Sequence, residues 1–192
     1  MFSLDDSGRR ALLIIARKSV VEGVQCRRES ALTSVPVALR SPAGAFVTLW
    51  KRKRLRGCIG QLDATSPVAL VVAHCAFGAA LEDPRFAPVS SEELPELEIE
   101  ISVLSPSFQI VASQVIVGEH GVVISRGHYR GVLLPKVAIE QGWSAERLLD
   151  ETSIKAGLPR EAWREPNTCI EAFTAEVFSE SDFAHPSPYA GA

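Results

Sequence analysis

The chain has 192 residues, of which 46% are hydrophobic and 22% are charged, the usual proportions of a globular protein and far from those of a disordered one. Its formal net charge of −3 argues against binding to nucleic acid or to a membrane surface, because both need a basic excess. The sequence has no signal peptide at its start and no run of roughly 20 apolar residues that could span a membrane. We therefore expect a soluble, cytoplasmic protein that acts on neither nucleic acids nor membranes.

The four cysteines, Cys26, Cys58, Cys75 and Cys169, are far apart in the sequence, and no pair has CxxC spacing. A chain of this length can bury a core without disulfides, so we expect reduced thiols. The sequence also lacks zinc-like spacing, and the adjacent His74 and Cys75 would point roughly 100° apart on a helix. It therefore predicts neither a metal site nor another cofactor.

The first element in chain order is a helix that should begin near Ser3, which with Asp6 forms a capping-box-like pair, and end at Gly23. Residues 45–62 then look like a β-hairpin, because two runs of strand-forming residues flank the basic segment 51–54, which would form the turn.

A second helix has the best-marked limits in the chain. Ser66 can cap it, and Pro67 suits the first helical position. The pair Asp83-Pro84 ends it, because the residue before a proline avoids the helical region. Residues 97–104 then alternate between apolar and polar types, which predicts a half-buried strand.

The rest of the chain is richer in strands. Ser144 should cap a further helix that stops at Gly157. Strands are expected at 108–111, 121–125, 129–134 and 168–178. Strands cluster between helices without regular βαβ alternation, and no internal repeat or low-complexity linker marks a domain boundary, which favours an α+β fold. We expect one domain over residues 1–178 and a loose C-terminal tail over 179–192.

Charge is distributed unevenly along the sequence. A basic run covers residues 51–56, and an acidic run covers residues 92–100. The basic run resembles a short nucleic-acid patch, but it lacks interleaved aromatic residues and lies in an acidic protein. We interpret it as a solvated hairpin tip, which could also dock on an acidic surface of a partner or of a second copy.

The segment Leu55–Gly60 carries the most chemical information. If it is a regular strand, Leu55 and Ile59 face the core, and Cys58 lies beside Arg56 on the other face. A guanidinium close to a thiol favours the nucleophilic thiolate. Gly57 and Gly60 would leave the backbone open to the close approach of a ligand or another strand. The alternative is a buried, inert Cys58 in a structural hairpin, a common role for cysteine.

Leu55-Arg56-Gly57-Cys58-Ile59-Gly60 resembles the signature hexapeptide of the AMMECR1 family. The resemblance continues, in family order, through Asp83-Pro84-Arg85-Phe86, His120-Gly121, Leu133-Leu134-Pro135 and Lys155-Ala156-Gly157-Leu158. It implies an α+β fold with an antiparallel or mixed sheet flanked by helices and two unequal subdomains, with the hexapeptide near a cleft between them. It also implies association with a Memo-like protein and a radical-SAM protein, in which this chain is similar to protein A of the AmmeMemoRadiSam grouping. The resemblance implies no settled activity.

Three further residues of these motifs are candidates for chemistry. Asp83 and Arg85 could position a polar substrate, or they could form an ion pair in a surface turn. His120 could act as a base for Cys58, or it could be a hydrogen-bonded loop histidine. Many relatives have a cysteine where this chain has Ser153, so a mechanism that needs two thiols is disfavoured here.

Two functions are consistent with these residues. The first is an enzyme or enzyme component with Cys58 as the nucleophile, acting on a small polar or anionic substrate. Arg56 and Arg85 would hold the anionic part, with the backbone at Gly57 and Gly60, and His120 or Asp83 would move protons. The alternative is a non-catalytic ligand-binding or adaptor module for the Memo-like and radical-SAM partners.

Overall fold

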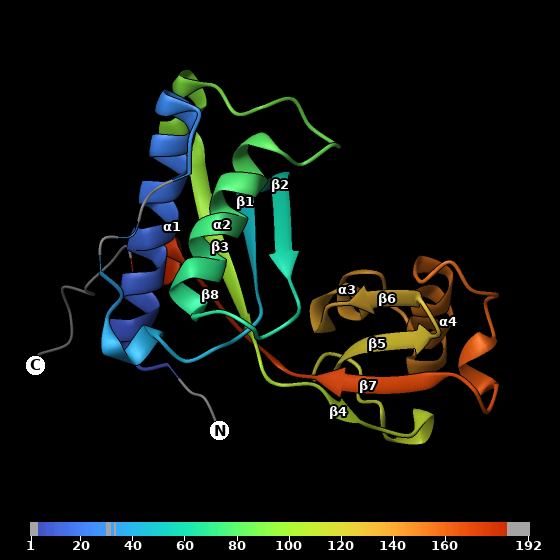
Figure 1. The fold of residues 1–192 in the computed structure, drawn as a ribbon. Helices are drawn as coiled ribbons and strands as arrows, with labels where there is room; N and C mark the ends of the chain where they lie inside the picture. The colour runs from blue at the N-terminus through green and yellow to red at the C-terminus, as the bar shows by residue number, and fades with distance from the viewer. Residues whose placement is uncertain (1–3, 30–31, 33, 184–192) are drawn as a thin grey trace, which may run out of the picture. The chain divides into compact units, whose positions relative to one another are not determined.

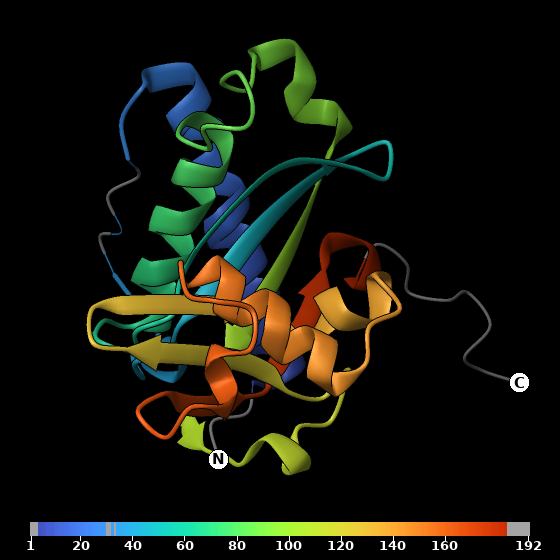
Figure 2. The ribbon, with the colours of Figure 1, turned by 90° about the vertical axis from the view of Figure 1, so that its right-hand side faces the viewer.

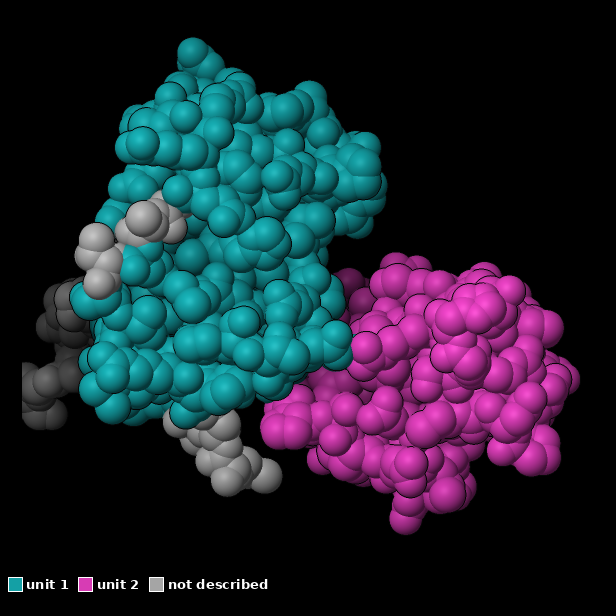
Figure 3. All heavy atoms as spheres, viewed as in Figure 1, with its two compact units in different colours: residues 1–104, 176–192 teal, residues 105–175 magenta. Residues whose placement is uncertain are grey.

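The computed structural model describes residues 4–29, 32 and 34–183 of the chain. The polypeptide divides into two compact units, coloured differently in Figure 3. The first unit combines Met1–Leu104 with Glu176–Ala192, and the second is the contiguous segment Ser105–Ala175 inserted between them. Both contain sheets and helices, so the predicted α+β class with two unequal subdomains is confirmed.

The first unit is built on a four-stranded sheet with the strand order β2-β1-β3-β8. Its strands are β1 (Ala45–Lys51), β2 (Arg54–Gln61), β3 (Leu97–Leu104) and β8 (Ala175–Ser179). Strand β1 pairs antiparallel with both β2 and β3, which confirms the predicted hairpin and the predicted third strand.

Two long helices, α1 (Asp6–Cys26) and α2 (Val68–Leu81), lie side by side on one face of this sheet (Figure 1). In the view turned by 90°, α2 (green) lies to the left of the strands and α1 (blue) passes behind them (Figure 2). Helix α2 packs on β1 and β2 and is apolar around most of its circumference, as expected of a helix buried between α1 and the sheet. The buried core of the first unit lies between these two layers.

Helix α1 differs from the prediction at both ends. Asp5 is its N-cap, and the Asp5 carboxylate accepts a 2.7 Å hydrogen bond from the Gly8 amide, whereas Ser3 lies outside the described residues. The helix continues past Gly23 to Cys26. A Cβ at Gly23 would lie 2.8 Å from the ring of Phe77, so this glycine allows α1 to approach α2 closely and does not end the helix.

The limits of α2 agree with the prediction to within two residues. Pro67 is the N-cap and Val68 the first helical residue, so Ser66 does not cap the helix. At its C-terminal end the helix stops at Leu81, shortly before Asp83-Pro84, as predicted.

The second unit has its own four-stranded antiparallel sheet, with the strand order β4-β7-β5-β6. Its strands are β4 (Phe108–Gln109), β5 (Gly121–Arg126), β6 (Tyr129–Leu133) and β7 (Cys169–Phe173). Helix α4 (Ala145–Lys155) packs on β5 and β6, and Ser144 caps it as predicted, accepting a 3.2 Å hydrogen bond from the Arg147 amide. A short helix, α3 (Pro135–Glu140), was not predicted.

The described residues also form five short 3₁₀ helices. They are η1 (Val37–Leu39), η2 (Ser91–Glu96), η3 (Ala112–Gln114), η4 (Ala162–Arg164) and η5 (Glu180–Phe183). Among the helices that the structure describes, none is both long enough and apolar enough to cross a lipid bilayer.

The predicted strand 168–178 is in fact two strands that belong to two different sheets. β7 pairs with β4 and β5 in the second unit, β8 lies beside β3 in the first unit, and Thr174 separates them. The Thr174 amide donates a 2.9 Å hydrogen bond to Ser105 Oγ, and the Ser105 amide donates one of 2.9 Å to the Thr174 carbonyl. These bonds join the points at which the chain enters and leaves the inserted unit.

The first residues of the expected loose tail are in fact packed against the first unit. Ser179 ends β8 and residues 180–183 form η5. The Glu180 carboxylate accepts hydrogen bonds from the Arg17 guanidinium and, at 2.9 Å, from the Ile99 amide. This ion pair and backbone contact hold the segment in place, and the remainder of the expected tail, residues 184–192, lies outside the described residues.

Candidate functional site

A β-bulge in the hairpin determines which way the hexapeptide side chains point. Leu49 pairs with Gly57, but the next residue, Trp50, pairs with Leu55, so Arg56 is an extra residue with no partner on β1. A bulge of this kind interrupts the alternation of faces along a strand. The prediction that Leu55 to Gly60 form a regular strand is therefore wrong at Arg56.

The bulge places the two apolar residues of the hexapeptide on opposite faces. Ile59 pairs with Val47 and packs against the core beneath the helices. Leu55 pairs with Trp50, three positions farther along β1, and is 37% exposed. Only Ile59 therefore faces the core as expected.

Cys58 lies on the sheet face opposite to the helices, as predicted. It pairs with Thr48, and the Thr48 hydroxyl donates a 3.4 Å hydrogen bond to Cys58 Sγ. Thr48 is buried, whereas Cys58 is only half-buried. The thiol therefore has a polar neighbour that can orient it and is not an inert part of the apolar core.

The turn that follows α2 binds both the amide and the carbonyl of Cys58. Its amide donates a 2.8 Å hydrogen bond to the Asp83 carboxylate, and its carbonyl accepts one of 3.2 Å from Arg85 Nη2. Arg85 also binds Asp83 through its amide, Nε and Nη2, at 3.1, 2.9 and 2.7 Å. The motif Asp83-Pro84-Arg85 is thus a clamp on the backbone of Cys58.

Asp83 is ionised in this clamp. Its side chain is 3% exposed, and hydrogen bonding to Arg85 is the main reason why its pKa falls from 3.8 to about 2, with the amide of Cys58 contributing in the same direction. A carboxylate with so low a pKa and four donors already bound is poorly suited to move protons near neutral pH. Its geometry fits a positioning residue and not the proton carrier that the sequence suggested.

Arg85 is the guanidinium that lies near the Cys58 thiol. Its side chain is 55% exposed, although one edge is fixed by Asp83. The pKa of Arg85 is raised above its ordinary value mainly by the hydrogen bonds to Asp83, with smaller contributions from Cys58. The site therefore presents a fixed positive charge to solvent beside a half-buried thiol.

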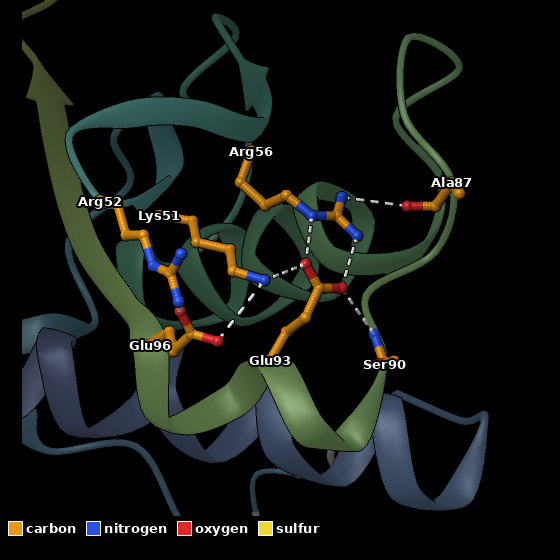
Figure 4. A network of polar contacts seen from close by, with 7 residues as sticks. All are labelled: Lys51, Arg52, Arg56, Ala87, Ser90, Glu93 and Glu96. Carbon is orange, nitrogen blue, oxygen red and sulfur yellow. Dashed lines mark hydrogen bonds and ion pairs between the residues drawn. The ribbon is translucent and has the colours of Figure 1, made fainter.

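The guanidinium of Arg56, in contrast, is bound to other residues of the first unit. Its Nε and Nη2 donate to the Glu93 carboxylate at 3.0 and 2.8 Å, and its Nη1 donates to the Ala87 carbonyl at 3.0 Å (Figure 4). The same carboxylate accepts hydrogen bonds from Lys51 Nζ at 3.0 Å and from the Ser90 amide at 3.1 Å. Glu93 is therefore the centre of a network that joins the hairpin to η2.

This network leaves Arg56 little capacity to bind a substrate. Its hydrogen bonds are the main reason why the pKa of Glu93 falls from 4.5 to about 2. The guanidinium makes two bonds to one carboxylate and one to a carbonyl, so the substrate-binding role expected for Arg56 is replaced by a structural one.

The basic and acidic runs of the sequence meet in the same network. Arg52 Nη2 lies 2.7 Å from Glu96, and Lys51 Nζ lies 3.6 Å from Glu96 and 3.0 Å from Glu93. The basic hairpin was interpreted as a solvated tip that could also dock on an acidic surface, and the chain itself supplies an acidic surface for it.

Atoms of the first unit occupy the space beside both glycines of the hexapeptide. A Cβ at Gly57 would lie 2.1 Å from the carbonyl oxygen of Ala79 in α2. A Cβ at Gly60 would lie 2.1 Å from the ring of Phe46. The two glycines therefore allow the close approach of a helix backbone and of an aromatic ring. These groups already fill the space in which a ligand was expected to approach.

His120 belongs to the second unit. It is buried, its Nδ1 accepts a 3.2 Å hydrogen bond from the Ile116 amide, and its ring meets the ring of Phe108 edge to face at 5.8 Å. Because Nδ1 is an acceptor, the neutral ring carries its proton on Nε2. Its pairing with Cys58 stays a prediction.

Within the described part of the chain, no three His, Cys, Asp or Glu side chains are grouped so that they could hold a metal ion. The candidate site is therefore a thiol, a hydroxyl and a clamped guanidinium on one unit. Sequence reasoning identified Cys58, Asp83 and Arg85, whereas it missed Thr48 and Glu93.

An α+β unit inserted between two strands of another α+β unit, with a cysteine-containing hairpin held by an Asp-Pro-Arg turn, defines a distinct class of protein. The chain belongs to the AMMECR1 family, whose model matches residues 13–178.

Relatives in archaea match this chain over most of its length. A protein of Methanothermobacter thermautotrophicus is 39% identical, over 91% of this chain and 95% of the relative. Protein TK0174 of Thermococcus kodakarensis is 38% identical over 94% of each chain. The crystal structure of uncharacterized protein PH0010 from Pyrococcus horikoshii matches with a TM-score of 0.87 and 35% identity, covering 94% of each chain.

Proposed function

We propose that this protein is an enzyme, or a component of one, that binds a small anionic substrate beside Cys58 and uses the Cys58 thiolate as a nucleophile. The observation that carries this proposal is the half-exposed guanidinium of Arg85, which Asp83 fixes against the peptide of Cys58. Covalent catalysis on an anionic substrate needs a nucleophile, a charge that attracts the anion and a residue that fixes both in place.

Each group has a separate task in this proposal. Arg85 holds the anionic part of the substrate through the N–H groups that face solvent, and Thr48 orients Sγ. A C–S bond forms between Sγ and an electrophilic carbon of the substrate as the bond from that carbon to its leaving group breaks, and the thiol proton passes to water. Asp83 acts only by positioning Cys58 and Arg85.

Two alkylating reagents of nearly equal size test the anionic preference directly. Iodoacetate carries a carboxylate and iodoacetamide is neutral, and both alkylate a thiolate through their CH₂ carbon with loss of iodide. We expect the ratio of the iodoacetate rate to the iodoacetamide rate to be higher at Cys58 than at the other thiols, as resolved by mass spectrometry of the folded protein. Arg85→Gln should remove this excess, because the attracting charge is lost.

The chain contains its own controls for this experiment. Cys169 is a free, half-buried thiol like Cys58 and lies in the second unit. Cys75 is fully buried, and burial raises its pKa to about 12, so it should react only on unfolding. Equal reagent ratios at Cys58 and Cys169, or an Arg85→Gln variant that keeps the excess, would refute an anion site at the thiol.

The alternative function is a non-catalytic ligand-binding or adaptor module for Memo-like and radical-SAM partners. The ion pairs with Glu93 and Glu96 count against docking through the basic hairpin, because three of its five cations, Lys51, Arg52 and Arg56, are already paired. Two results together would favour this alternative. Such partners would copurify with Cys58→Ser as well as with the parent protein, and Cys58 would show no preference for iodoacetate over iodoacetamide.

A further inference from the structure

The outer side of helix α1 carries apolar residues that the core does not use. Leu12, Ala16 and Val20 are fully buried, as expected for the inner face of an amphipathic helix. Ile14 is 68% exposed, and Val21 lies seven residues farther on, which is two helical turns along the same side. An apolar strip thus runs along the face where polar residues are expected.

Segment η5 forms a second wall beside this strip. Phe183 lines a groove of about 550 Å³ together with Leu13, Ile14 and Val21, a size within the usual range for small-molecule sites. This wall is fixed within the first unit, because the Glu180 carboxylate binds both the Arg17 guanidinium and the Ile99 amide. The groove is therefore a built feature of α1 and η5.

The rim of the groove is positively charged. Arg10, Arg17 and Lys18 line it, and Glu180 is its only acidic residue among those described. Arg17 is neutralised by Glu180, whereas the Arg10 guanidinium lies 4.4 Å from the centre of the Phe183 ring. Among the described residues, Lys18 has an exposed i,i+4 contact of 3.6 Å with Glu22, which is weak in water.

These features fit one class of ligand. An apolar floor would bury a hydrocarbon chain, and two cations at the rim would bind an anionic head group. We propose that the groove between α1 and η5 binds a soluble single-chain amphiphile with a carboxylate head. The site is separate from Cys58 and does not depend on the function proposed for it.

Three ten-carbon probes separate the contributions of charge and apolar surface. The full-length protein, with isotope-labelled isoleucine methyl groups, is titrated with decanoate, decanol or decyltrimethylammonium, each below its own aggregation concentration. Decanoate should shift the Ile14 methyl resonance in a saturable way, decanol should bind more weakly, and the cationic probe should bind most weakly. Ile139, which is 63% exposed in the second unit, is the internal control and should not respond.

Substitutions then identify the residues responsible. The double variant Arg10→Gln/Lys18→Gln should raise the dissociation constant for decanoate about tenfold, as the loss of hydrogen bonds to a charged group does, and leave that for decanol unchanged. Lys53→Gln, which removes a cation from the exposed hairpin tip, should have no effect. Ile14→Ser should weaken both probes without loss of stability, because Ile14 buries little surface in the folded protein.

Three outcomes would overturn this inference. The first is equal binding of decanoate and the cationic probe, and the second is a response of Ile139 that matches that of Ile14. The third is a concentration-dependent dimer that shields Ile14 and excludes decanoate, since the occupant would then be a second copy of the chain.

Discussion

The backbone amide of Cys58 donates a 2.8 Å hydrogen bond to a carboxylate oxygen of Asp83, twenty-five residues later in the chain. One acidic side chain thus fixes an inner part of the hairpin strand to the turn that ends helix α2. Because Arg85 binds the carbonyl of the same residue and is itself bound to Asp83, the position of the thiol and the position of the guanidinium are set together.

Acid should weaken the fold through Asp83. Its pKa in the folded protein is about 2, below its ordinary value of 3.8, so as the pH falls the unfolded chain takes up a proton first. The stabilisation is present above about pH 4 and is lost as the pH falls to about 2. Asp83→Asn should lower the free energy of unfolding at pH 7 by about 2 kcal/mol and reduce the loss between pH 4 and pH 2, as measured by urea denaturation.

The exposed Asp6 provides the control for this prediction. Its carboxylate is 75% exposed and forms only an i,i+3 ion pair with Arg9, so Asp6→Asn should change the free energy of unfolding by less than about 1 kcal/mol. If Asp83→Asn has the same free energy of unfolding and the same acid response as the parent protein, the hydrogen bonds of Asp83 do not stabilise the fold.

Glu93 and Glu96 form a matched pair for the hairpin network. Glu93 is mostly buried and binds Arg56, Lys51 and the Ser90 amide, whereas Glu96 pairs with the well-exposed Arg52. Glu93→Gln should therefore cost about 2 kcal/mol in the free energy of unfolding, and Glu96→Gln less than about 1 kcal/mol. Equal effects in thermal or chemical denaturation would mean that burial does not strengthen this network.

Substitution of Gly57 should damage the packing of the hairpin on α2. Gly57→Ala places a methyl group 2.1 Å from a carbonyl oxygen of the α2 backbone and should cost about 3 kcal/mol. Gly78→Ala is the control at the same interface, because its methyl group would meet the Ile59 side chain at 3.3 Å and the helix gains from alanine. Chemical denaturation should show a much smaller change for Gly78→Ala, and the reverse order would be inconsistent with the close approach.

The hairpin turn should be open to stabilisation. Arg52 and Lys53 both have positive φ, at 51° and 61°, where a two-residue turn favours asparagine and glycine. Lys53→Gly should raise the free energy of unfolding by about 1 kcal/mol because it relieves the left-handed conformation. Arg54→Gly, one residue later in the extended strand, should lower it, so thermal denaturation should show shifts of opposite sign.

The sequence predicted well those elements whose limits are fixed by local chemistry. Pro67 and the pair Asp83-Pro84 bracket α2 because proline restricts the backbone wherever it occurs. The prediction that Gly23 ends α1 was wrong, because this glycine makes room for the ring of Phe77, a residue of another helix. Helix α3 was missed because it is short and follows a strand directly at Pro135.

The parts of the candidate site that escaped prediction depend on distant residues. A two-residue turn at Arg52 and Lys53 with regular pairing would place Thr48 opposite Gly57, and only the bulge at Arg56 moves it opposite Cys58. Nothing in the local sequence marks that bulge, and the partner of Arg56, Glu93, lies in a separate 3₁₀ helix. The motif residues could therefore be identified, but not their division into clamp, thiol and structural ion pair.

The insertion of Ser105–Ala175 affects the order in which the protein can be completed during synthesis. Translation delivers the chain from its N-terminus, and compact units fold as their residues emerge. The inserted unit is whole once Ala175 has been made, whereas the first unit still lacks most of β8 and the carboxylates of Glu176 and Glu180 that bind Arg9 and Arg17. The unit whose synthesis begins first is therefore the last to be completed. The ion pairs of helix α1 with Glu176 and Glu180 can form only after the whole inserted unit has emerged from the ribosome.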